Sequence, residues 1–300
     1  MSFNVQALQT YVDQVSSELM GKLYWKGDSL KYFKKMAGVT GTIAINYFDI
    51  VPYIHTGDWC NTILDSGTTT FYQKDITVCD YKTEGLWCVN TLQKQWLGWY
   101  MKGVAGDSTE PFEKQLIDQL IAKTLEGVED KVWMGTDNSC TLGLYYQLSA
   151  DTARTATGTT SITISNVISQ IMLLLRNLPA ELQNDDELYM FVAPQVYTLF
   201  QQAMFQNNNY GVPLLNYDAN GDIIINWLGP KFILHQTFGL RGTNYMFLTT
   251  LKNLFHAFDG TSDEEKVDVW YERIYDQICY RIKWRQGQTY WLGDYFITNF

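Results

Sequence analysis

The first stretch of the chain repeats hydrophobic residues at three- and four-residue intervals, a spacing that places them on one face of an α-helix. Polar residues without a clear period follow as far as about residue 36, so we expect residues 1–36 to be an arm rather than the start of a compact domain. Residues 41–53 have a composition typical of a strand. The residues that predict the helix are Val5, Leu8, Tyr11, Val12, Val15 and Leu19.

Residues 54–104 form a separate block that is rich in Thr, Tyr and Trp. Turn residues at 56–58 and 65–67 precede a strand pattern over 69–79, and a second strand-like run covers 86–92. A two-stranded excursion of this kind is too narrow to hold a core and is marginally stable alone. We therefore expect it to lie against another surface, and a second subunit is one candidate.

The clearest single element is a long helix over residues 111–134. Thr109 is a suitable N-cap, Pro111 fits the first turn and Gly135 ends the helix. At about 1.5 Å per residue it would be roughly 36 Å long, which makes it a structural rod. Its apolar stripe contains Leu116, Leu120, Ile121, Val128 and Val132, together with Ile117 and Leu125.

A polar connection of small residues at 150–160 marks a domain boundary. Beyond it, residues 161–258 mix helix and strand patterns, which predicts an α/β domain. Asn208 and Tyr210 lie in the loop that follows its second helix. The expected helices cover 164–177 and 194–206, and the expected strands cover 188–192, 223–227, 231–236 and 245–250.

The tail over residues 266–284 alternates like a long strand, and the alternation changes phase near Arg273. This change suggests a bulge or a twist. We expect the pairing partner of the tail near residues 140–148. One domain would then be built from two separated segments, with the α/β domain inserted between them.

Composition and charge narrow the function. Aromatic residues make up 15% of the chain, which suggests extensive burial, some of it against other chains. A well-packed monomer would show the same excess. The net charge of −10 argues against duplex recognition, because phosphate binding needs a basic face. A basic run near the N-terminus is expected to be solvated or to face a partner: Lys22, Lys26, Lys31, Lys34 and Lys35.

The chain has five cysteines, an odd number, and no C-x-x-C pair, which argues against a disulfide framework and a zinc site. We expect reduced, mostly buried thiols in a protein assembled in a cytoplasm. No apolar run approaches the roughly 20 residues that cross a bilayer, and no signal peptide is expected. The cysteines are Cys60, Cys79, Cys88, Cys140 and Cys279.

The sequence lacks the common motifs of catalysis and cofactor binding. No serine-nucleophile, phosphate-loop or dinucleotide-binding pattern is present, and His55, His235 and His256 belong to no ligand pair. Residues 216–223 imitate the start of a calcium loop, but its twelfth position is Trp227 instead of a bidentate Glu. We therefore predict a hairpin turn there, and neither an enzyme nor a bound cofactor or metal.

A second group of carboxylates lies in a turn rich in Gly, Thr and Ser, where we expect it to be solvated. Its members are Asp259, Asp263, Glu264 and Glu265.

The order of these parts resembles the major capsid proteins of tailed bacteriophages with the Hong Kong 97-type fold, an α+β fold. The likeness spans nearly the whole chain. Residues 110–136 (EPFEKQLIDQLIAKTLEGVEDKVWMGT) are similar to the family's spine helix, which ends at a glycine, and GLYYQL follows at 143–148. Residues 164–203 are similar to the helix, strand and helix of the family's axial domain.

The resemblance implies an N-terminal arm with a lead-in strand (1–53), an extended β-loop (54–104), a peripheral domain with the spine helix (105–160 with 259–300) and an inserted axial α/β domain (161–258). The extended loop would lie across the neighbouring subunit, and the axial domain would meet its copies around five- and sixfold axes. The implied contact residues are Asp65, Phe71, Tyr72, Lys74, Lys82 and Trp87 in the extended loop, and Asn208 and Tyr210 in the axial loop.

The function that the resemblance implies is self-assembly of hexamers and pentamers into an icosahedral shell around the double-stranded DNA genome of a tailed phage. The implied partners are portal, scaffolding and decoration proteins. DNA would be contacted only non-specifically, and no membrane would be involved. The protein would be assembled in the host cytoplasm and reside in the virion.

Two other functions remain open. An encapsulin, the shell protein of a cellular compartment, has the same fold, and the spine and axial patterns do not separate it from a phage capsid protein. A carbohydrate-active enzyme could use the many Trp and Tyr residues as stacking platforms. Against an enzyme, the aromatic residues are spread along the chain and the carboxylates do not pair around one cleft.

Overall fold

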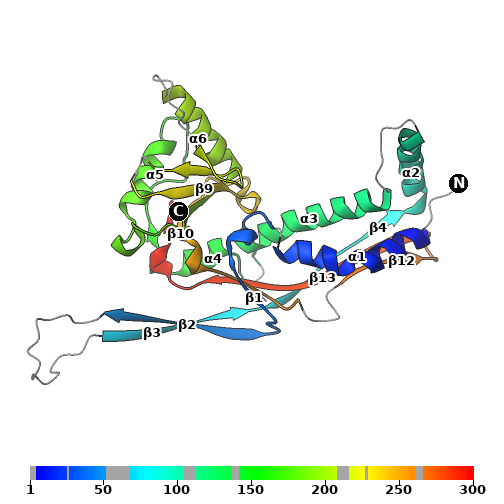
Figure 1. Ribbon diagram of the computed structural model, residues 1–300, viewed down its shortest axis with the longest axis horizontal. Helices are drawn as coiled ribbons and strands as arrows, with labels where there is room; N and C mark the ends of the chain where they lie inside the picture. Colours follow the sequence, from blue (N-terminus) through cyan, green and yellow to red (C-terminus); the bar gives the residue numbers. More distant parts are fainter. Residues whose placement is uncertain are drawn as a thin grey trace, which may run out of the picture.

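A computed structural model of the protein describes residues 5–25, 27–51, 68–104, 112–136, 142–207, 216–226, 229–260 and 266–300. These residues form a five-stranded sheet, a seven-stranded sheet and a two-stranded hairpin (Figure 1). The hairpin projects from the body on the side opposite to α2 (Val89–Val104). None of the described helices is long and apolar enough to cross a membrane.

The N-terminal helix α1 (Val5–Trp25) forms where the three- and four-residue spacing predicts it. Its apolar face is buried against the long helix α3 and the strand β12, with Leu8 and Val12 fully covered. The expectation of a separate arm is therefore wrong for this helix, because its apolar stripe finds a partner within the same subunit. The chain continues through the short helix η1 (Leu30–Tyr32) into β1 (Lys34–Ala37).

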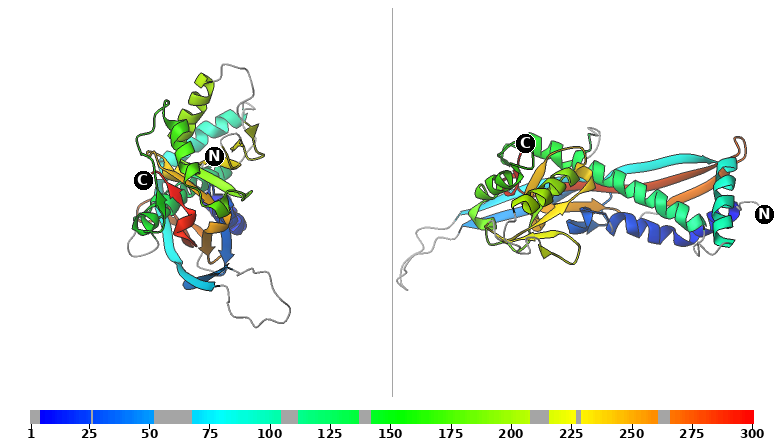
Figure 2. Two further views of the ribbon diagram at one scale, coloured as in Figure 1. Left: turned by 90° about the vertical axis from the view of Figure 1, so that its left-hand side faces the viewer. Right: turned by 90° about the horizontal axis from the view of Figure 1, so that it is seen from above.

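The predicted rod is the helix α3 (Phe112–Met134). It runs beside α1 along the five-stranded sheet (Figures 1 and 2). Gly135 ends it as predicted, but its φ is not positive. A Cβ there would lie 2.5 Å from the carbonyl oxygen of Lys131, so close backbone approach explains the glycine. The expected cap residues Thr109 and Pro111 lie outside the described residues.

The five-stranded sheet is organised around β13 (Gln277–Tyr290), which pairs with β4 (Cys79–Cys88), β12 (Val267–Glu272) and β11 (Leu254–Phe258). The tail is therefore two antiparallel strands, not one bulged strand. The phase change near Arg273 is a turn, in which Asp276 has a φ of +50°. The predicted partner near 140–148 is wrong, because that stretch contains the helix α4 (Leu144–Ala150).

The seven-stranded sheet has β6 (Leu188–Val192) near its centre, between β10 (Met246–Thr250) and β9 (Phe232–Gln236). All five residues of β6 are buried. The predicted helix–strand–helix order is confirmed by α5 (Val167–Arg176), β6 and α6 (Pro194–Asn207). The other strands are β8 (Ile223–Ile225), β7 (Asn216–Tyr217), β14 (Ile297–Thr298) and β5 (Thr155–Ala156).

The two sheets exchange segments of the chain. β11 belongs to the five-stranded sheet, although residues 161–258 were expected to form one inserted domain. In return, β14 enters the seven-stranded sheet between β5 and β10. The expected boundary at residue 258 therefore does not coincide with a boundary between sheets. Short helical turns complete the body: η2 (Ala180–Leu182), η3 (Phe238–Leu240), η4 (Leu251–Asn253) and η5 (Gly293–Tyr295).

The hairpin consists of β2 (Thr42–Val51) and β3 (Thr68–Thr77). The excursion therefore begins earlier than residue 54 and ends before β4, which lies in the five-stranded sheet. Residues 89–104 form α2 instead of continuing a strand. Leu92 and Trp96 in this stretch are spaced as on a helix and both pack on the main core, so the predicted strand over 86–92 was wrong beyond Cys88.

Candidate assembly interface

The far half of the hairpin exposes apolar side chains on one of its faces. Phe48 and Phe71 are opposite each other in the antiparallel register, with ring centroids 6.5 Å apart. Their side chains are 59% and 79% exposed, and Ile50 on the same face is 57% exposed. Clustered apolar residues on an exposed surface are typical of an interaction site.

The near half of the hairpin is attached to the body. Ile45 and Ile76 are buried in a small apolar cluster of their own, together with Val78 and with Phe255 of β11. Because successive side chains of a strand point to opposite faces, this attachment uses the face opposite to Phe48 and Phe71. The hairpin therefore has an anchored base and a free apolar half.

Lys74 lies at this anchored base and not on the exposed face. Its Nζ is 3.1 Å from the centroid of the Tyr290 ring, and Tyr290 donates a hydrogen bond of 2.7 Å to Asp151. Burial lowers the pKa of Lys74 to about 8, although the charge of Asp151 opposes the shift. A cavity of about 180 Å³ beside Lys74 is lined by Tyr47, Tyr72 and Trp291, among other residues.

Lys82 and Trp87, which were expected in the extended loop, lie in β4. Lys82 is 65% exposed and forms an ion pair of 3.0 Å with Glu84. The ring of Trp87 packs at a tilt on Tyr280, with centroids 4.5 Å apart. Tyr280 is opposite Gly85, where any Cβ would collide with its ring. These residues therefore support the five-stranded sheet, and the hairpin contains neither of them.

The stripe of the spine helix faces the core as predicted. Ile121, Val128 and Val132 are buried, while Leu116 and Leu120 are partly buried against the same core. Asp65, Asn208 and Tyr210 lie outside the described residues.

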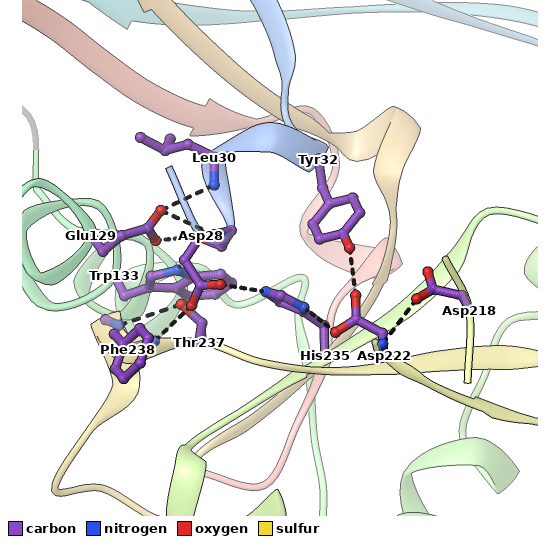
Figure 3. A network of polar contacts seen from close by, with 12 residues as sticks. Asp28, Leu30, Tyr32, Glu129, Trp133, Asp218, Asp222, His235, Thr237 and Phe238 are labelled. Atoms are coloured by element: carbon purple, nitrogen blue, oxygen red, sulfur yellow. Dashed lines mark hydrogen bonds and ion pairs between the residues drawn. The ribbon is translucent and has the colours of Figure 1, made fainter. Parts of the chain in front are cut away.

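The spine helix also contains a buried carboxylate that the sequence analysis overlooked. Glu129 accepts hydrogen bonds from the backbone nitrogens of Ser29 (3.0 Å) and Leu30 (3.2 Å), and from the Ser29 hydroxyl (Figure 3). Trp133, one turn later, donates to the same hydroxyl at 2.8 Å. Burial raises the pKa of Glu129. This contact fixes the segment 27–33 on the middle of the body.

A second polar group holds the same segment on the seven-stranded sheet. His235 Nδ1 is 2.7 Å from Asp222, and Tyr32 donates to the other oxygen of Asp222. Asp28 accepts a hydrogen bond of 3.1 Å from the backbone nitrogen of Phe238. The segment therefore touches α3, β9 and the residue preceding β8 at once (Figure 3).

The calcium-like sequence is a hairpin turn between β7 and β8, as predicted. Asp218 accepts hydrogen bonds from the backbone nitrogens of Asn220 (2.8 Å) and Asp222 (2.9 Å), and Gly221 has a φ of +85°. In the part of the chain that the structure describes, no three His, Cys, Asp or Glu side chains gather as metal ligands do.

The expectations for the acidic turn and for the cysteines need correction. Asp259 is not solvated: it is 1% exposed and lies 3.2 Å from Arg285, while Asp263, Glu264 and Glu265 are outside the described residues. The thiols are not all reduced and buried, because Cys79 is disulfide-bonded and Cys88 is free but exposed.

The basic run near the N-terminus is not a single solvated face either. The ammonium of Lys35 donates to the carbonyl of Tyr24, and burial lowers its pKa to about 8. Lys22 pairs with Glu18 at 3.3 Å and with Asp118 of α3 at 3.5 Å. These two lysines therefore serve packing within the subunit.

Comparison with known proteins rests on structure alone, since no protein-family model and no curated protein matches the chain. A chain of the satellite phage P4 procapsid, in a structure that includes the size determination (Sid) protein, matches with a TM-score of 0.59 at 10% identity. The match covers 94% of this chain and 98% of that one. Gordonia phage Cozz gives 0.57 at 8% identity, covering 89% and 84%.

A virus-like particle from Pyrococcus furiosus matches with a TM-score of 0.51 at 11% identity, covering 96% of this chain and 98% of that one. The chain thus has the α+β fold of tailed-phage capsid proteins, the Hong Kong 97-type fold. The predicted fold class is confirmed.

Proposed function

We propose that the protein is the major capsid protein of a tailed phage, many copies of which close into an icosahedral shell around double-stranded DNA. The observation that carries the proposal is the hairpin, which combines an anchored base with the exposed Phe48, Ile50 and Phe71. An apolar patch held away from the body has no partner among the described residues of its own chain. A second copy supplies that partner, and repetition around the shell multiplies a contact that is weak by itself.

The finer assignments follow from this function. The seven-stranded sheet with α5 and α6 would meet its copies around five- and sixfold axes, with Asn208 and Tyr210 at the contact. Portal, scaffolding and decoration proteins would be the other partners, and the acidic chain would confine DNA without gripping it. The shell would form in the host cytoplasm and reside in the virion.

Substitution of Phe71 tests the proposal. Phe71→Ser removes most of a large apolar contact, worth about 1.5–3 kcal/mol when fully buried, so we expect the concentration needed for shell formation to rise at least about tenfold. Phe71→Leu keeps an apolar side chain and should assemble nearly as the wild type does. Both should fold normally, because Phe71 makes little contact within its own subunit. Sedimentation velocity and electron microscopy measure assembly, and circular dichroism checks folding.

Equal assembly of all three proteins would contradict the role of the hairpin. A wild-type chain that stays monomeric under every condition, including co-expression with a scaffolding protein, would contradict the shell itself. An encapsulin, the shell protein of a cellular compartment, has the same fold and is the second candidate. Particles isolated from their natural source separate the two, since a phage shell protects DNA from nuclease and a compartment contains an enzyme cargo.

A further inference from the structure

His235 occupies a buried position between two carboxylates from different parts of the chain. Its side chain is 3% exposed, and its Nδ1 is 2.7 Å from Asp222. Its Nε2 is 3.6 Å from an oxygen of Asp28 and forms no hydrogen bond. A neutral ring that donates from Nδ1 to Asp222 turns the lone pair of Nε2 toward the Asp28 carboxylate, which is repulsive. A ring protonated on both nitrogens donates to both carboxylates.

Several elements contribute charged or titratable groups around His235 and its two carboxylate partners. The N-terminal segment contributes Asp28, Tyr32 and the exposed Lys31, the turn before β8 contributes Asp218 and Asp222, β6 contributes Tyr189, and α3 contributes Glu129. Lys31 is the one cation in this set. Burial opposes ionisation of Asp222, but hydrogen bonds from His235 and Tyr32 outweigh it and lower the pKa of Asp222. Asp222 is therefore a carboxylate over the range in which histidine titrates.

The segment held by these contacts leads directly to the hairpin. Asp28 precedes η1 and Tyr32 is its last residue, and the chain then forms β1 at the edge of the five-stranded sheet and β2 of the hairpin. Asp28 reaches the seven-stranded sheet by its hydrogen bond from the backbone nitrogen of Phe238 and by its approach to His235. The attachment of residues 27–33 to the seven-stranded sheet therefore depends on whether His235 Nε2 carries a proton that it can donate to Asp28.

We propose that His235, Asp28 and Asp222 form a proton-operated clamp, which holds the segment 27–33 on the seven-stranded sheet when His235 is protonated and loosens when it is neutral. The clamp is internal to the subunit and does not depend on shell formation. Its contribution to stability is present at low pH, while both ring nitrogens carry protons, and is lost as the pH rises and the ring releases one of them. On the acidic side it is also lost once Asp222 becomes protonated.

Asp28→Asn is the sharpest test, because it replaces one carboxylate with a group of the same shape. The amide can accept the backbone hydrogen bond of Phe238 and can donate to a neutral Nε2, so the variant should fold and hold the segment at any pH in this range. His256 is an internal control, since burial lowers its pKa to about 3 and it does not titrate near neutrality.

The measurement is hydrogen exchange of the backbone amides of residues 28–33 in dilute, unassembled protein, corrected for the intrinsic pH dependence of exchange. Between pH 5.5 and 8 we expect opening of this segment in the wild type to become about tenfold more frequent, the size of one hydrogen bond to a charged partner. In Asp28→Asn the increase should disappear. A wild-type segment that is insensitive to pH, or an equal increase in both proteins, would overturn the proposal. Neither outcome bears on shell assembly, which the Phe71 variants test separately.

Discussion

Glu129 is a buried carboxylate whose hydrogen-bond donors are all neutral. A charge that leaves water without a compensating cation is costly, and here backbone and hydroxyl donors offset part of that cost. In return, the hydrogen bonds of the carboxylate hold the segment 27–33 in a fixed position. Gly27 belongs to the same arrangement, because a Cβ there would lie 2.8 Å from a Glu129 oxygen. Position 27 therefore has little room for a side chain larger than that of glycine.

Substitutions at Glu129 should separate its charge from its hydrogen bonds. Glu129→Ala leaves the nitrogens of Ser29 and Leu30 without an acceptor, and we expect it to lower the free energy of unfolding by about 3 kcal/mol. Glu129→Gln keeps an acceptor for them and should stay within about 1 kcal/mol of the wild type. Because the pKa of Glu129 is raised by burial, the wild type loses stability as the pH rises above 4.5. Gln should therefore become the better residue toward neutral pH.

Urea unfolding of the three proteins at several pH values measures these differences. Thr10→Ala, an exposed position on α1, is a control that should change little. Equal losses for Ala and Gln at pH 7 would show that shape and not hydrogen bonding determines this site.

The sequence showed that some residues are apolar and periodic, but it could not show which polar residues are buried with them. Val128 and Val132 were recognised by their spacing, whereas Glu129, adjacent to Val128, was not singled out. His235 was expected to belong to no ligand pair, and Asp28 lies 207 positions away from it in the numbering. Nothing local in the sequence indicates that these two side chains meet.

Among the elements, those with a clear helical period or a short, continuous apolar run were predicted well. α3, α6 and β6 have their expected limits to within one residue. The long strand β13 was recognised as extended, but its partners were not, because pairing between distant segments depends on tertiary contacts. The same reason explains the misplaced end of the excursion: β3 and β4 follow each other with only Val78 between them, and only the change of partner from β2 to β13 separates them.

The hairpin is attached to the body through one buried ammonium group as well as apolar contacts, which predicts a dependence on pH. Lys74 has a pKa of about 8 in the folded protein, mainly because of burial, against 10.5 ordinarily. Between these values the folded protein binds fewer protons than the unfolded chain, so its stability rises with pH. We expect the wild type to gain stability relative to Lys74→Met from about pH 8 to pH 10.5.

Chemical unfolding across this range measures the effect. The similar contribution of Lys35 is present in both proteins and cancels in the difference. Lys82→Met, on the exposed face of β4, is the matched control and should follow the wild type. A constant difference between wild type and Lys74→Met would mean that Lys74 is not held in the buried position next to Tyr290.

On the scale of the whole molecule, the two sheets share one apolar core that runs from α1 and α3 to β6 and β10. The chain also crosses between the sheets more than once. β11 lies in a different sheet from the preceding strand β10, and β14 lies in a different sheet from the preceding strand β13. Dense sharing of this kind predicts one cooperative unfolding transition. A subunit that must keep its shape while many copies assemble benefits from such rigidity.

Removal of residues 297–300 tests this cooperativity. β14 lies between β5 and β10, with Ile297 fully buried, and the ring of Phe300 packs on Tyr145 and Tyr245 with centroids 4.7 and 4.9 Å apart. Deletion therefore exposes an edge of the seven-stranded sheet and opens a cavity. Loss of Ile297 alone is worth about 2–5 kcal/mol, and we expect the deletion to lower the Tm of the entire molecule.

Scanning calorimetry should show a single transition for both proteins, shifted downward in the deletion variant. Ile274→Ala, a change at an exposed position on the β12–β13 turn, is the control and should leave the Tm unchanged. The five-stranded sheet is the informative part, because β14 pairs only with strands of the other sheet among the described residues. If that sheet still melted at the wild-type temperature while the seven-stranded sheet unfolded earlier, the two sheets would be independent. The shared core and the exchange of strands would then not couple the unfolding of one sheet to that of the other.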